Sequence, residues 1–311
     1  QLFKRLLEYY SFCLYLYFKQ AGLEMMELND WITGHEIPLR LGFFFGIFAL
    51  IALWELAAPR RALTISRAVR WGNNLGIVAL NTAILRLLFP AAAIGVAVFA
   101  DQQGWGLFNY YDINPVLAVI LAVVLMDFVI YLQHVMVHAV PVLWRLHRVH
   151  HADLDYDVTT GARFHPIEII LSLLIKFATI ILLGAPVVAV VIFEIVLNGM
   201  AMFNHGNIRL PLPADRVLRW LVVTPDMHRV HHSVEDDEAN SNFGFNLSIW
   251  DRIFGTYRDQ PRGGHEGMTI GIHRYRDPRE VDRLPGMLML PFDGEISEYA
   301  INTRRWKGSK E

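Results

Sequence analysis

The sequence predicts an all-α fold, a polytopic membrane bundle of about four to five spans, including a short hairpin, with a helical, histidine-rich cap on its cytoplasmic face. Apolar residues make up 54% of the 311 residues, charged residues only 19%, and the mean hydropathy is positive. Such a composition is typical of membrane proteins. Most of the 13 histidines stand at helical spacings just outside the apolar runs, which predicts a cap built around them.

Composition also excludes several kinds of partner and site. The formal net charge is −2, and no basic tract or stacking platform suggests nucleic acid. The single cysteine, Cys13, excludes an intrachain disulfide, a Cys-x-x-Cys zinc site and a cysteine-ligated iron–sulfur cluster. Any metal is therefore expected to be held by histidine.

The chain is expected to have three parts: an N-terminal extension (1–39), a membrane-embedded domain with the histidine cap (40–258) and a soluble C-terminal tail (259–311). In the extension, the apolar run from Tyr9 to Phe18 is too short to span a bilayer and lacks a small-residue cleavage site. We therefore predict neither a signal peptide nor a membrane helix in residues 1–25.

Three spans are expected in the first half of the domain. The first runs from Leu41 to Ala58, the second from Asn74 to Phe99 with a kink at Pro90, and the third from Pro115 to Gln133. The short loop after the first span is crowded with arginines, namely Arg60, Arg61, Arg67 and Arg70. Residues 100–114 contain no Lys or Arg, so the arginine loop is expected in the cytoplasm and residues 100–114 outside.

A helical hairpin is expected next, formed by apolar runs over residues 167–183 and 187–203 that meet at Gly184-Ala185-Pro186. A hairpin returns the chain to the side that it left. The histidines of residues 134–165 and 205–232 are therefore expected on the same cytoplasmic face. Residues 214–223 have the mixed face of a helix in the membrane interface. Thr224-Pro225-Asp226 then predicts the start of a new helix.

The histidine motifs predict a metal site. The pentad His-Arg-Val-His-His occurs twice, at residues 147–151 and 228–232, and His134 and His138 stand one helical turn apart. Residues three and four apart lie on one helix face, so the histidines of each motif should project together. We expect a site for about two ions, for which an all-imidazole shell favours iron, zinc or copper.

Other histidines and one acid have weaker patterns. His165 and His205 are single, and each is either a ligand or a satisfied hydrogen-bonding residue. His35, His265 and His273 are expected to be ordinary surface residues. Asp127 shares a helical stripe with His134 and His138, so its carboxylate is a candidate acceptor for the second ring N–H of a metal-bound histidine. The alternative is that Asp127 pairs with an arginine such as Arg86.

The order of these motifs, with spans between them, resembles the fatty acid hydroxylase/sterol desaturase superfamily of integral-membrane di-iron enzymes. Flanking segments strengthen the resemblance: Leu-Trp-Arg (143–145), Asp-Val-Thr-Thr (157–160), Arg-Phe-His-Pro (163–166), Asn-Phe-Gly (242–244) and Ile-Trp-Asp-Arg-Ile-Phe-Gly-Thr (249–256). The resemblance covers residues 41–257.

The resemblance implies two irons that activate O2 to hydroxylate or desaturate an unactivated C–H bond of a fatty acyl, sterol-like or ether lipid. The implied ligands are His134, His138, His147, His150, His151, His205, His228, His231 and His232, with His165 less certain. Zinc can replace iron on purification. The lipid would enter from the bilayer, and a separate donor of the ferredoxin or cytochrome b5 type would supply electrons. The expected location is a bacterial inner membrane or an ER-type membrane. The alternatives are a non-redox zinc hydrolase and a metal-handling membrane protein.

Overall fold

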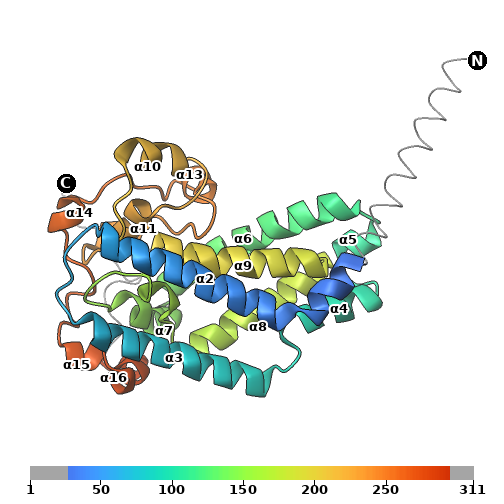
Figure 1. Ribbon diagram of the computed structural model, residues 1–311, viewed down its shortest axis with the longest axis horizontal. Coiled ribbons are helices and arrows are strands. Elements are labelled where there is room, and N and C mark those ends of the chain that lie inside the picture. The colour runs from blue at the N-terminus through green and yellow to red at the C-terminus, as the bar shows by residue number, and fades with distance from the viewer. Residues whose placement is uncertain (1–26, 295–311) are drawn as a thin grey trace, which may run out of the picture. The chain divides into compact units, whose positions relative to one another are not determined.

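The computed structural model describes residues 27–294 (Figure 1), so the expectations for residues 1–25 and for the last part of the tail lie outside the described residues. Within the described part, regular structure is helical throughout, with only isolated bridge pairs such as Pro59 with Ile208. The all-α prediction is confirmed.

Five segments of the described chain are long and apolar enough to cross a membrane. They are α2 (Glu36–Ala57), the segment Arg67–Tyr110, α6 (Pro115–Ala139), α8 (Pro166–Leu183) and α9 (Val187–Asn204). Large apolar side chains on these helices stay exposed, as Leu50, Leu53 and Leu56 do on α2. A soluble protein rarely exposes so continuous an apolar surface. The five candidate spans include α8 and α9, so the predicted number of spans and the predicted hairpin are both confirmed.

The second predicted span differs in detail from the structure. The segment Arg67–Tyr110 is divided into α3 (Arg67–Leu88), α4 (Ala92–Gln102) and α5 (Leu107–Tyr110). The expected kink at Pro90 is a full break, since proline has no N–H for the helix ladder and its ring clashes with the preceding turn. Ala92 adopts a positive φ of 50° at the same place.

The chain forms two compact units. Of the described residues, the first unit gathers 27–42, 91–126 and 174–195, and the second gathers 43–90, 127–173 and 196–294. In the first unit, the buried Glu194 pairs with Lys176 at 2.7 Å and with Arg40 at 3.3 Å, so its charge is matched within an apolar bundle. All the candidate ligand histidines belong to the second unit.

The cap of the second unit is a set of short helices. They are α7 (Pro141–His151), η1 (Thr160–Ala162), α10 (Leu212–Leu218), α11 (Pro225–His231), α12 (Asp236–Ala239), α13 (Ile249–Ile253), α14 (Gly264–Gly267), α15 (Pro278–Val281), α16 (Leu284–Met289) and η2 (Leu290–Phe292). Helix α11 starts as predicted, because the Thr224 side chain accepts a hydrogen bond from the Met227 backbone N–H. Figure 1 shows α10 and α13 close together, and the Ser248 hydroxyl donates to the Arg219 carbonyl at 2.8 Å.

Residues beyond 258 contribute to the core of this cap. Tyr275, Met287 and Leu290 are buried together with Trp144 and Val149 of α7. The boundary at residue 258 stays a prediction, but the chain after it packs against the helix that carries the first pentad.

Candidate metal centre

Nine histidines lie together in the second unit, in two groups. The first group is His134 and His138 of α6, His147 and His151 of α7, and His231 of α11; the second is His150, His205, His228 and His232. All nine are buried, and within each group one ring nitrogen of every histidine lies within 4.8 Å of the others. The structure thus brings together every histidine of the predicted set except His165.

Each pentad is divided between the two groups. Helix α7 gives His147 and His151 to the first group and His150 to the second, whereas α11 gives only His231 to the first. The expectation that all three histidines of a pentad serve one site is therefore refined. Neighbouring positions on a helix differ in direction by about 100°, so His150 and His151 turn to different sides of the same helix end. The two groups are adjacent, with ring centroids of His151 and His232 4.5 Å apart.

Pairs of ring nitrogens face each other at short range. His134 Nε2 lies 3.0 Å from His231 Nε2, and His138 Nε2 lies 3.1 Å from His151 Nε2. In the second group, His205 Nε2 lies 3.1 Å from Nε2 of both His150 and His228.

The opposite ring nitrogens show which tautomer these histidines adopt. Nδ1 of His134 lies 2.8 Å from the Phe243 carbonyl oxygen, and Nδ1 of His231 lies 2.8 Å from the Ser241 carbonyl oxygen. A carbonyl oxygen only accepts, so each Nδ1 carries the proton and each Nε2 presents a lone pair. Two lone pairs at 3.0 Å cannot form a hydrogen bond. A cation between them would relieve the repulsion, and the donor set fits a metal ion.

Unpartnered nitrogens support the same fit. Among the described residues, the buried ring nitrogens without a hydrogen-bond partner include His147 Nε2 and both ring nitrogens of His232. A buried polar atom left unpaired costs about 1–3 kcal/mol. Metal coordination would satisfy the nitrogens that point into the two groups.

Burial favours the neutral form of three histidines of the second group, His150, His205 and His228. Burial, followed by repulsion from neighbouring imidazoles, lowers the pKa of His150 and His228 well below its ordinary value. Burial also lowers the pKa of His205 to about 3. Neutral imidazole is the form that binds a metal.

Two residues that sequence reasoning missed, Glu168 and Asn240, contact Nδ1 of His147 and His138, the ring nitrogen that points away from the other histidines. His147 Nδ1 donates to the buried Glu168 carboxylate at 2.6 Å, and His138 Nδ1 faces Asn240 Oδ1 at 3.2 Å. The acid at the start of the apolar helix α8 was the available signal for Glu168, because an acid in a span has a reason to be there. Glu168 therefore makes the contact with a candidate ligand histidine that was expected of Asp127.

Asp127 itself has other partners. Its carboxylate accepts from the backbone N–H groups of Asn246 (3.3 Å) and Leu247 (3.2 Å) and from Trp250 Nε1 (2.8 Å). The N–H of His134 goes to Phe243 instead. The direct contact between Asp127 and a ligand histidine is thus not found, and neither is the alternative pair with Arg86. Asp127 anchors the segment that follows the second pentad.

Burial and bonding place three further residues, and two of them, His265 and Arg70, differ from expectation. His165 lies outside both groups, and its Nδ1 accepts from the Ile167 backbone N–H at 3.2 Å. His265 was expected on the surface but is buried beside Asp226, with Nε2 3.5 Å from a carboxylate oxygen. Arg70, assigned to the arginine loop, is buried in α3.

Arg70 belongs to an ionic network behind the first pentad. Its guanidinium donates to both oxygens of Asp153 at 2.8 Å and also pairs with Asp157. Arg163 pairs with Asp282 at 3.0 Å and lies 3.5 Å from Asp153. Every member is buried, and each of the three aspartates contacts at least one of the two arginines, so no buried carboxylate is left without a cation. The network ties the chain after His151 to α3.

Glu55 at the end of α2 positions the segment around His205. One of its carboxylate oxygens accepts from the backbone N–H groups of both Val158 and Asn207, each at 2.7 Å. Because Asn207 follows His205 by two residues and Val158 follows the first pentad, one side chain holds two segments of the site together.

Comparisons with known proteins agree with this geometry. Residues 119–256, which contain both histidine groups, match the fatty acid hydroxylase family. Ornithine lipid hydroxylase OlsE of Rhizobium tropici is 33% identical over 70% of this chain and 67% of its own length. Alkylglycerol monooxygenase of Xenopus tropicalis is 26% identical over 67% of this chain and 46% of its own length. Fatty acid hydroxylase vlmA of a Lecanicillium species is 26% identical over 68% of this chain and 60% of its own length.

This chain spans less than half of the Xenopus monooxygenase, so the likeness there concerns part of that protein. No solved structure matches the chain. The extent and identity of the match to the Rhizobium hydroxylase, together with the family match over both histidine groups, show that the chain belongs to the fatty acid hydroxylase family.

Proposed function

We propose that the protein is an oxidoreductase that hydroxylates or desaturates an unactivated C–H bond of a membrane lipid at a two-iron, histidine-ligated centre. The observation that carries the proposal is the pair of adjacent histidine groups, with the Nε2 lone pairs of His134 and His231 facing each other in the first group. The named activities of the relatives, a lipid hydroxylase and a monooxygenase, support lipid oxidation.

The nine histidines and Glu168 would have different roles in this reaction. The nine histidines of the two groups would hold two irons, which when bound supply the activation of O2. Glu168 keeps the His147 ring in the tautomer with a free Nε2. Burial of all nine rings excludes bulk water and so limits side reactions.

The reaction needs an external source of electrons. Hydroxylation inserts one oxygen atom of O2 into the C–H bond, and two electrons with two protons convert the other atom to water. Desaturation consumes the same electrons and protons, and both oxygen atoms become water. We propose a separate donor of the ferredoxin or cytochrome b5 type, which would reach the cap from the cytoplasm. The lipid would enter sideways from the bilayer of a bacterial inner membrane or an ER-type membrane.

The decisive experiment supplies ¹⁸O₂ to the purified, iron-loaded protein with a ferredoxin and its reductase. A total lipid extract is the substrate, and products are analysed by mass spectrometry. Hydroxylation predicts one ¹⁸O atom per product, and desaturation predicts loss of two hydrogens without label. The His231→Ala variant and an anaerobic sample are the controls. Lipid hydrolysis without O2 consumption would replace this proposal by a zinc hydrolase.

A further inference from the structure

A pocket of about 330 Å³ lies at the ends of two membrane helices in the second unit. Arg60 follows the end of α2, and Arg209 follows the end of α9. The two segments pair through their backbones, since Arg209 N–H donates to the Ala58 carbonyl at 3.0 Å. The end of a span is where lipid headgroups lie, and arginines there contact their phosphates.

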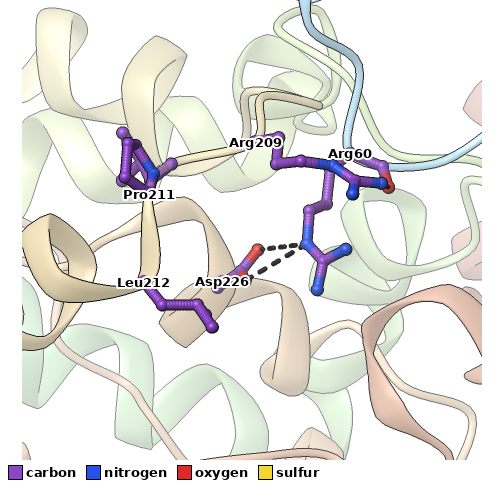
Figure 2. Close-up of a pocket in the computed structure, with 6 residues that line it drawn as sticks. Arg60, Arg209, Pro211, Leu212 and Asp226 are labelled. Atoms are coloured by element: carbon purple, nitrogen blue, oxygen red, sulfur yellow. Dashed lines mark hydrogen bonds and ion pairs between the residues drawn. The ribbon is translucent and has the colours of Figure 1, made fainter.

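The pocket is lined by charged side chains on one side and by apolar side chains on the other. Figure 2 shows Arg60 bonded to Asp226, with Pro211 and Leu212 across from Arg60. Leu212 is exposed and begins α10. Beyond it Trp220 and other large apolar side chains are exposed too, as on a segment that lies in the membrane interface. A headgroup with its chains would meet both surfaces.

The charges at the pocket leave a positive surplus. Asp226 pairs with the buried Arg229 and also accepts from Arg60 at 3.2 Å. Glu266 accepts from Arg60 Nη1 and from Arg209 Nη2, each at 2.9 Å. Three arginines therefore face two carboxylates. An oxyanion that approaches Arg60 and Arg209 would therefore meet a net positive charge even while Glu266 is in place.

Glu266 occupies the place that an incoming oxyanion would take. Its side chain is 64% exposed, and that of Arg209 is 58% exposed, so their ion pair contributes little to stability. Glycines flank Glu266 at positions 264 and 267, and a Cβ at either would meet open space. The carboxylate can leave without disturbing the core.

We propose that Arg60 and Arg209 bind the oxyanion of a lipid headgroup, a phosphate or a carboxylate, in place of the Glu266 carboxylate. This inference rests on the proposed function, because the lipid held here would be the one oxidised. Asp226 begins α11, the helix that carries His228 and His231. Because Asp226 accepts from Arg60, a headgroup bound by Arg60 would lie next to the helix that carries these two histidines.

The test measures binding of phosphatidylglycerol to the full chain in detergent micelles by native mass spectrometry. Arg209→Gln should weaken binding by up to about fivefold, the scale of an exposed ion pair. Glu266→Gln should strengthen it several-fold, because a competing carboxylate is removed. Arg216→Gln, an exposed arginine of α10 outside the pocket, and Glu280→Gln are the matched charge controls and should change little.

The outcomes separate the possible explanations. Equal effects of Arg209→Gln and Arg216→Gln would mean general charge attraction and would overturn the inference. So would the absence of tighter binding in Glu266→Gln. Diacylglycerol, which lacks an oxyanion, should show no dependence on Arg209. If inorganic phosphate binds as tightly as phosphatidylglycerol, the pocket is a free-phosphate site and the lipid inference fails.

Failure of the inference is distinguishable from failure of the proposed function. Lipid binding is measured without turnover, so binding that depends on Arg209 with no ¹⁸O incorporation would overturn the function alone. Incorporation of ¹⁸O with binding that ignores Arg209 would overturn the inference alone. Metal content and thermal stability of Arg209→Gln confirm that the variant is folded.

Discussion

Replacing Glu168 tests how the second ring nitrogen of a candidate ligand is held. The Glu168 carboxylate accepts from His147 Nδ1 at 2.6 Å, and both side chains are buried. This bond keeps the proton on Nδ1 and leaves Nε2 as the lone pair for a metal. In Glu168→Gln, the amide can present its NH2 group instead, which would favour the tautomer with a protonated Nε2.

The expected effect follows from the kind of contact that is lost. Loss of an outer partner of a ligating histidine lowers metal affinity about 10- to 100-fold, which corresponds to about 1.4–2.7 kcal/mol. Glu168→Ala should lower metal affinity by about 100-fold or more, because it leaves a buried N–H without any acceptor. The assay measures retained iron or zinc after dialysis against graded chelator, with helix content measured by circular dichroism.

Asp127→Asn is the matched control, a second buried carboxylate on a membrane helix of the same unit. Among the described residues, Asp127 accepts from Asn246, Leu247 and Trp250 and not from a histidine. The carbonyl that holds His134 is anchored separately, since Asp251 accepts from the Phe243 backbone N–H at 2.7 Å. We therefore expect Asp127→Asn to lower thermal stability but to keep metal affinity. Equal metal affinities of Glu168→Gln and Asp127→Asn would refute the reasoning.

Three further predictions follow from the same geometry. The parent protein should retain about two metal ions, and His150→Ala and His231→Ala, one from each histidine group, should each lose at least about one by elemental analysis while the helical bundle persists. His165→Ala should keep full metal content, because His165 lies outside both groups; a loss equal to that of His231→Ala would restore it as a ligand. In a cysteine-free background, a cysteine at exposed Glu235 should label from the cytoplasmic side and one at exposed Gln103 from the opposite side. Labelling of both from one side would contradict the proposed sidedness.

The local sequence pattern was sufficient to predict the helices and most of the candidate metal ligands. The hairpin was expected over 167–183 and 187–203 and is observed as α8 (Pro166–Leu183) and α9 (Val187–Asn204). Apolar length and the Gly184-Ala185-Pro186 turn determine these elements within a few residues of sequence. The pentads were recognisable for the same reason, because i, i+3 and i+4 spacing is a local property of one helix.

Tertiary packing decided what each side chain touches. The division of each pentad between two groups depends on how α7 and α11 meet α6 and His205. Asp127 and Glu168 are both buried acids on apolar helices, yet of the two it is Glu168, which sequence reasoning missed, that reaches a histidine. The sequence by itself therefore determined the spans, the histidine motifs and the all-imidazole donor set, since these follow from composition and helical period. The partner of each ring nitrogen and the pocket between Arg60 and Arg209 were decided only by the tertiary structure, because contacts between residues far apart in the chain follow no local repeat.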